Sequence, residues 1–69
     1  MIAPVMSLAQ LQSKAYKDPK YKDLAIRAAE NLGEKPGNLT EAMELLRQVA
    51  VETSEDEVVE EVNFLRSEV

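Results

Sequence analysis

Residues 38–52 read NLTEAMELLRQVAVE, and this stretch decides the fold. Its apolar residues recur every three to four positions, which is the spacing of one face of an α-helix. This face comprises Leu39, Ala42, Met43, Leu45, Leu46, Val49 and Ala50. A face this wide usually packs against two neighbours, so we expect a central helix over about residues 39–52.

Start and stop signals on the amino-terminal side of this stretch predict two further helices. Ser7 opens a capping-box pattern, which favours a helix over about residues 8–17. Pro19 fits the first position of a helix, where its missing N–H costs nothing, and Gly33 is the residue type that commonly ends one. A second helix is therefore expected over about residues 19–32.

The carboxyl-terminal side of the central helix predicts one more helix. Ser54 is a good N-cap, and the acidic residues after it complement the positive end of a helix dipole, which favours a helix over about residues 55–68. The connections are short, so neighbouring helices should pack antiparallel or orthogonally. The sequence thus predicts an all-α fold: a compact bundle of four short helices that forms one domain over residues 1–69.

The junction of the second and third helices has the spacing of a helix-turn-helix. Gly33 follows the small residue Ala29 by four positions, and the apolar Leu39 follows six later. The pattern resembles that of helix-turn-helix regulators, which implies a close crossing of the two helices. It also implies an alternative function, a DNA-binding transcriptional regulator that uses residues 20–47. The segment that would read DNA, residues 34–47, carries more acidic than basic side chains, although phosphate neutralisation requires Lys and Arg.

The same region also resembles a second family. From Gly37 to Leu46 the chain reads GNLxxAxxLL, which is similar to the last helix of ubiquitin-associated (UBA-like) three-helix domains. This resemblance implies a UBA-like binding domain as a second alternative. The Met-Gly-Phe-type loop that forms part of that family's ubiquitin-binding surface is replaced here by Asp18-Pro19-Lys20.

Composition limits the chemistry open to this chain. It contains no cysteine and no histidine, so disulfides are excluded and the usual zinc ligands and general bases are missing. We therefore predict a non-catalytic protein with no metal, no cofactor and no small-molecule substrate. No apolar run approaches the ~20 residues that span a membrane, and the start lacks a basic signal region, so we expect a cytoplasmic protein without membrane contact.

Charge is unevenly placed along the chain. Residues 1–35 carry six basic and four acidic groups, a net charge of +2. Residues 36–69 carry two basic and nine acidic groups, a net charge of −7. This asymmetry predicts a molecule with two faces of opposite charge, unless the last helix is simply a solvated, glutamate-rich one.

The last helix carries the predicted partner-binding surface. Its apolar stripe, which Val59 and Phe64 widen, has an acidic rim. The stripe is Val58, Val62, Leu65 and Val69, and the rim is Glu57, Glu60, Glu61 and Glu68. An apolar seam with charged flanks is typical of helix pairing. We therefore expect a protein–protein interaction module, a small helical adaptor, regulator or subunit, that pairs with another protein or with a second copy of itself. The stripe could instead close the intramolecular core, and the sequence leaves both interpretations open.

A basic stretch near the first loop offers an alternative surface for nucleic acid. Its candidate contacts are Lys14, Lys17, Lys20, Lys22 and Lys35. Tyr16 and Tyr21 lie among these lysines, and aromatic rings beside cations can stack the bases of a single strand. Because the chain has only two tyrosines and one phenylalanine, we interpret both tyrosines as half-buried core residues with hydroxyls in water.

Overall fold

The computed structural model describes residues 4–68, which form four helices and no strand. The helices are α1 (Leu8–Ala15), α2 (Pro19–Asn31), α3 (Leu39–Glu52) and α4 (Glu55–Ser67). The predicted all-α bundle of four short helices is confirmed. Helix ends fall within two residues of the expected ones, because turn hydrogen bonds close the last turns, as where the Lys17 N–H donates to the Lys14 carbonyl at 3.0 Å. None of the helices in residues 4–68 is long and apolar enough to cross a bilayer.

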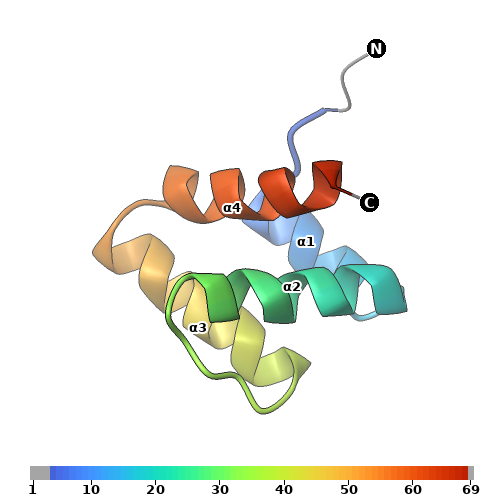
Figure 1. Ribbon diagram of the computed structural model, residues 1–69, viewed down its shortest axis with the longest axis horizontal. Coiled ribbons are helices and arrows are strands. Elements are labelled where there is room, and N and C mark those ends of the chain that lie inside the picture. Colours follow the sequence, from blue (N-terminus) through green and yellow to red (C-terminus); the bar gives the residue numbers. More distant parts are fainter. Residues whose placement is uncertain (1–3, 69) are drawn as a thin grey trace.

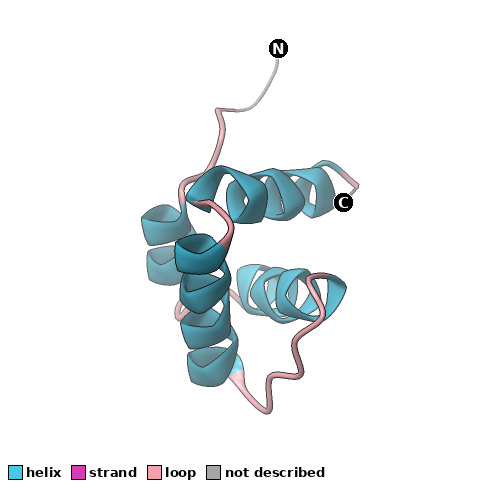
Figure 2. Ribbon diagram, turned by 90° about the vertical axis from the view of Figure 1, so that its left-hand side faces the viewer, coloured by secondary structure: helices cyan, strands magenta, loops and turns pink. Residues whose placement is uncertain are grey.

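The helices pack in a crossed arrangement. In Figure 1, α2 and α4 run in opposite directions, one above the other, and α1 lies behind them. Figure 2 shows α3 standing upright across the ends of α2 and α4. The helix-turn-helix-like crossing of α2 and α3, which the spacing of Ala29 and Gly33 predicts, is therefore present, and each helix contacts the other three.

The core is built around a face of small residues on α2. Ala25, Ala28 and Ala29 are fully buried, so the neighbouring helices approach the α2 backbone closely. The remaining buried residues of the core come from all four helices and the segment before α1, and most of them are larger: Met6, Leu8, Leu11, Ala15, Leu24, Leu39, Ala42, Met43, Leu46, Val58, Val62 and Leu65. The buried residues of all four helices thus form one continuous cluster.

A polar side chain caps the start of each helix. The capping side chains of Ser7, Asp18, Asn38 and Ser54 each accept a hydrogen bond from a backbone N–H two or three residues later. The reciprocal bond of a full capping box is present at Ser7, where Gln10 Oε1 accepts from the Ser7 N–H at 2.9 Å. These bonds satisfy donors that a helix start leaves free, so they fix where each helix begins.

Gly33 ends α2 as expected. Its φ of 91° lies in the left-handed region, which a residue with a Cβ adopts only with strain. The Gly33 N–H donates to the Glu30 carbonyl at 3.0 Å, and the Glu34 N–H donates to the Ala29 carbonyl at 2.9 Å. This pair of bonds is the Schellman motif, and it leaves Leu32 at the very end of the helix.

The amide side chain of Asn63 helps to hold the segment before α1 against α4. Asn63 Oδ1 accepts from the Met6 N–H at 3.0 Å, and Asn63 Nδ2 donates to the Met6 carbonyl at 3.1 Å. The same Nδ2 donates to the Val59 carbonyl at 2.7 Å. Because these bonds pair both polar groups of Met6, its side chain can enter the core without leaving the backbone unsatisfied.

Enlarging the small face of α2 should destabilise the fold. Ala28→Leu adds three heavy atoms at a fully buried position, and overpacking of this kind typically costs about 1–3 kcal/mol. Ala9→Leu makes the same change at an exposed position of α1 and should alter the free energy of unfolding by less than ~0.5 kcal/mol. Urea unfolding followed by circular dichroism measures both. Equal stabilities of the two variants would show that the helices do not pack on this face.

Removing the donor of Asn63 should loosen the segment before α1. Asn63→Asp keeps an acceptor for the Met6 N–H but places an anionic oxygen near two carbonyl oxygens, which should cost about 1–3 kcal/mol. Gln48→Glu makes the same amide-to-carboxylate change at an exposed position of α3 and serves as the control. Urea unfolding compares the two variants. If both variants unfold at the same urea concentration, the described packing of residues 4–7 against α4 is wrong.

Candidate functional site

The apolar stripe predicted on the last helix lies in the core. Val58, Val62 and Leu65 are each at most 2% exposed, and they pack with the buried residues of the other helices. The fourth member, Val69, lies outside the described residues. The expectation that this stripe is offered to a partner is therefore wrong for its three described members. The alternative, that the stripe closes the intramolecular core, describes them.

Phe64 does not widen the stripe. Its side chain is 62% exposed, although its neighbour in sequence, Leu65, is buried. Each residue of a helix is rotated by about 100° from the one before it, so Phe64 falls beside the buried stripe of α4 and not within it. Phe64 is the one phenylalanine of the chain, and packing of the core does not account for its presence on α4.

Phe64 lies on one face of α4 with three carboxylates. Glu57, Glu60, Glu61 and Phe64 follow the i, i+3, i+4, i+7 spacing that aligns side chains along a helix. Together with two residues from the end of α2 they line a shallow depression of about 510 Å³. We call this depression the acidic groove; its residues are Asn31, Leu32, Glu57, Glu60, Glu61 and Phe64.

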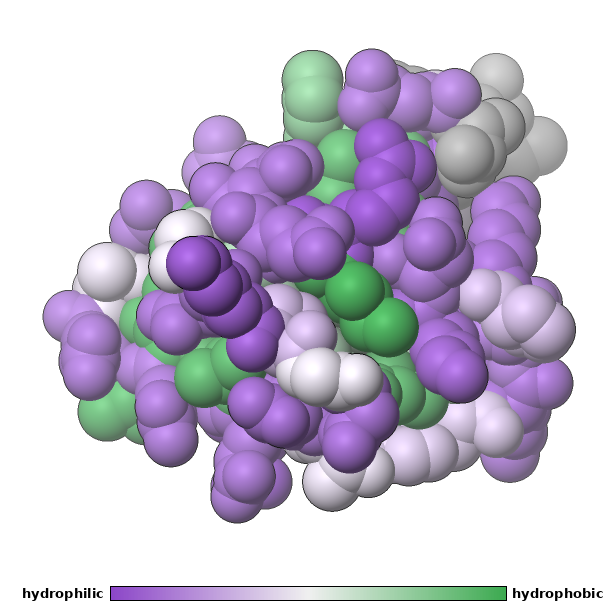
Figure 3. All heavy atoms as spheres, turned by 60° about the horizontal axis from the view of Figure 1, so that its bottom comes forward, coloured by the Kyte–Doolittle hydropathy of each residue, from purple (hydrophilic) through white to green (hydrophobic). Residues whose placement is uncertain are grey.

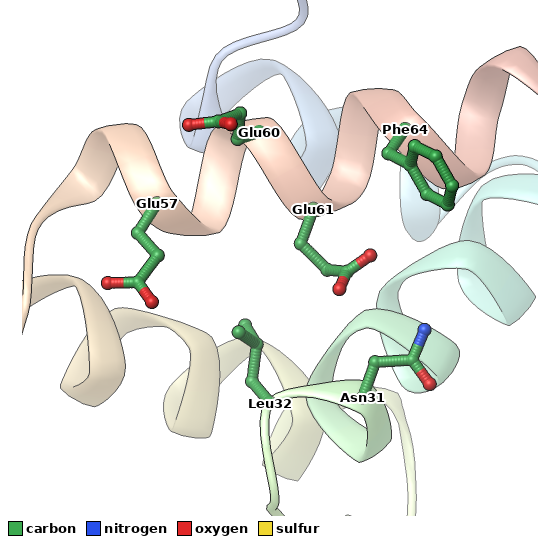
Figure 4. A pocket seen from close by; sticks show the side chains of 6 residues that line it. All are labelled: Asn31, Leu32, Glu57, Glu60, Glu61 and Phe64. Atoms are coloured by element: carbon green, nitrogen blue, oxygen red, sulfur yellow. The ribbon is translucent and has the colours of Figure 1, made fainter.

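The view in Figure 4 shows how these side chains lie. Glu57 and Glu61 extend downward from α4, and Leu32 extends upward between them from the end of α2. Glu60 points away from this gap, and the Phe64 ring lies further along α4, above Asn31. The groove therefore has a half-buried leucine between two carboxylates and an aromatic ring at one end.

The groove has one sign of charge. Three carboxylates line it and no Lys or Arg does, although the end of α2 contributes two uncharged residues. Carboxylates gathered on one surface repel one another and attract cations, so the local field at the groove is negative. Glu57, Glu60 and Glu61 of the predicted rim line this groove and Glu68 does not, while the described members of the stripe that they were expected to surround are buried.

A second charged surface lies at the start of the chain. Two adjoining hollows there share Gln10, Lys14 and Tyr21 among their lining residues. Lys17 lines one of these hollows, and Lys20 and Arg66 line the other. We call this surface the cationic face; its charged and aromatic members are Lys14, Lys17, Lys20, Tyr21 and Arg66. Asp18 is the one carboxylate among the residues that line either hollow.

The structure groups some of the lysines predicted to contact nucleic acid. Lys14, Lys17 and Lys20 lie together on the cationic face, and Lys14 Nζ lies 5.4 Å from the centre of the Tyr21 ring. Lys22 and Lys35 are exposed but line neither hollow. Arg66, which the sequence analysis did not include, joins the group from α4.

The two tyrosines differ in their surroundings. Tyr21 is half-buried, as predicted, and packs against the core. Tyr16 is 54% exposed, so the expectation that it is a core residue is wrong. Its hydroxyl pairs with that of Thr40 at 3.2 Å, which ties the end of α1 to the first turn of α3.

The outer face of α3 would be the reading surface of a helix-turn-helix protein. Glu44, Arg47, Gln48, Val51 and Glu52 line a shallow hollow on this face. Two carboxylates and one guanidinium give it a net negative charge, which phosphate groups would repel. The geometry of α2 and α3 therefore resembles a helix-turn-helix while the charge of its outer face argues against DNA.

Apolar side chains do not gather into one broad surface on the side shown in Figure 3. Green apolar groups appear there as separate strips between purple polar ones. A partner that docks on such a surface has to satisfy polar groups as well as cover apolar ones.

Residues 4–68 contain no cluster of three Asp or Glu side chains placed to hold a metal ion.

Comparison of the chain with models of protein families, with curated proteins and with solved structures finds no match. The acidic groove and the cationic face are therefore interpreted from their own chemistry.

Proposed function

We propose that this chain is a non-catalytic protein–protein interaction module, a small helical adaptor, regulator or subunit, whose acidic groove binds a basic segment of a partner. The observation that carries the proposal is the exposed ring of Phe64 beside Glu57, Glu60 and Glu61. The groove combines an aromatic anchor with a rim of one charge, which are the two components of a specific protein contact.

Phe64 supplies the apolar part of this contact. Aromatic side chains are enriched at the centres of interfaces, where covering one ring removes a large apolar area from water. Leu32 extends this area from the end of α2, because it is only partly covered by the core. An apolar side chain of the partner would lie between Leu32 and Phe64.

The carboxylates select the charge of the partner. Glu57 and Glu60 are exposed and Glu61 is half-buried, so all three can meet Lys or Arg at the rim of the groove. An Arg guanidinium could also stack on the Phe64 ring, which favours arginine over lysine near that end. A short amphipathic segment with basic flanks and an apolar centre therefore fits best.

The same groove of a second copy is a poor partner. A twofold contact would place Glu57, Glu60 and Glu61 opposite their own counterparts, because symmetric interfaces juxtapose the same patch from both subunits. Like charges at such an interface cost free energy and slow association. The predicted self-pairing through the last helix is thus replaced by a contact with a surface of opposite charge.

Binding of model peptides tests this proposal. We expect the chain to bind an amphipathic helical peptide with Lys and Arg around a leucine stripe, and not its counterpart with Glu in place of the basic residues. Phe64→Ala should raise the Kd about tenfold, because truncating an anchoring aromatic usually costs more than ~1 kcal/mol. Glu60→Lys should slow association and weaken binding several-fold. Fluorescence anisotropy of a labelled peptide measures the Kd at equilibrium and the association rate after rapid mixing.

Matched controls come from the outer face of α3. Val51→Ala truncates an apolar side chain that is 86% exposed, and Glu44→Lys reverses an exposed charge, so both should leave the Kd unchanged. Equal affinity for the basic and acidic peptides would refute the charge selection. Equal losses in the groove variants and the α3 variants would move the contact away from the acidic groove.

A further inference from the structure

The cationic face has the complementary chemistry of the acidic groove. The cationic face carries Lys14, Lys17, Lys20 and Arg66, whereas the acidic groove carries three carboxylates. Its second hollow is also lined by Pro4, Val5 and Tyr21, and Val5 is 70% exposed. One surface therefore offers cations around apolar groups, and the other offers carboxylates around an exposed aromatic ring.

The hollow has room for the Phe64 side chain. Its volume is about 410 Å³, and it is a surface depression that is open to solvent. A phenyl ring placed there would meet Val5 and Tyr21 and would have Lys14, Lys20 and Arg66 within reach of its carboxylate neighbours. The apolar and the charged parts of the two surfaces can thus be matched in one contact.

The two surfaces lie on different flanks of α4 and cannot meet within one chain. Phe64 and Arg66 are two positions apart, which rotates their side chains by about 200° around the helix axis. Arg66 Nη2 donates to the Pro4 carbonyl at 2.6 Å on the side of the chain start, while Phe64 faces the end of α2. Each copy therefore has one surface of each kind free for a different neighbour.

We propose that the partner of the acidic groove is the cationic face of a second copy, so that chains associate head to tail. This inference rests on the proposed function of the groove as a protein-binding surface, and it names the partner. The contact joins two different patches, so it closes into a ring if the rotation between copies allows and otherwise forms an open chain.

The net charge of −5 does not prevent this contact at physiological salt. At about 150 mM salt the screening length is about 8 Å, so repulsion between whole chains falls off while facing charges in contact still attract. Association should therefore weaken at molar salt, where these contacts are screened as well.

Complementary charge reversals test the head-to-tail contact. Glu57→Lys with Glu60→Lys inactivates the groove, and Lys14→Glu with Lys20→Glu inactivates the cationic face; all four positions are exposed. Sedimentation equilibrium at concentrations up to about 1 mM should show that the wild type self-associates. The dissociation constant of self-association should be at least about tenfold higher for each double variant. An equimolar mixture of the two double variants should associate again, because each variant retains one working surface and the two reversed surfaces are complementary in charge.

The control is Glu44→Lys with Glu52→Lys, which changes the net charge as the groove variant does but on the outer face of α3. It should associate at least as well as the wild type. Amide chemical shifts of the wild type, followed on dilution, give a readout that needs no variant: they should change around residues 14–21 and around residues 57–64.

Three results would overturn the inference: a wild type that stays monomeric, a mixture of double variants that does not pair, or a control that loses association as the groove variant does. The basic peptide separates this failure from failure of the proposed function. A monomeric wild type that binds the peptide refutes head-to-tail association alone, whereas one that binds neither peptide nor itself refutes both.

Discussion

The close approach of the helices to the alanine face of α2 is the constraint on which the remaining structure depends. Ala25, Ala28 and Ala29 are fully buried, and α2 contacts each of the other helices. A short chain buries a smaller share of its surface than a long one, about 60% for a domain of this size, so it has little apolar surface to spare. The small side chains allow four short helices to share one core instead of packing as separate pairs.

Packing of the core determines which residues of α4 remain exposed. Val58, Val62 and Leu65 are buried in the core, so the exposed surface of α4 consists of the residues that the core leaves out. On one flank these are Phe64 and the carboxylates of the acidic groove. On the other flank Asn63 and Arg66 hold the segment before α1, which brings the apolar groups of that segment next to the lysines of the cationic face.

Local features of the fold were predictable because their interactions span only a few residues. The N-cap bonds of Ser7, Asp18, Asn38 and Ser54 reach two or three residues along the chain, and Gly33 closes α2 through bonds that reach at most five. Residue types at fixed spacing suffice to predict such interactions. The lysines of the cationic face were also identified, since three of them lie within seven consecutive positions.

The sequence by itself determined the four helices, their order and most of the apolar face of each, because helix periodicity and capping are local properties of the chain. Only the tertiary structure decided which faces meet. An apolar stripe looks the same whether its own chain or a partner covers it, and burial of Val58 and Val62 answers that question. The exposure of Phe64 follows from the same packing. The bonds between Asn63 and Met6 join residues 57 positions apart, and no local pattern predicts a pairing that exists only once α4 lies beside the start of the chain.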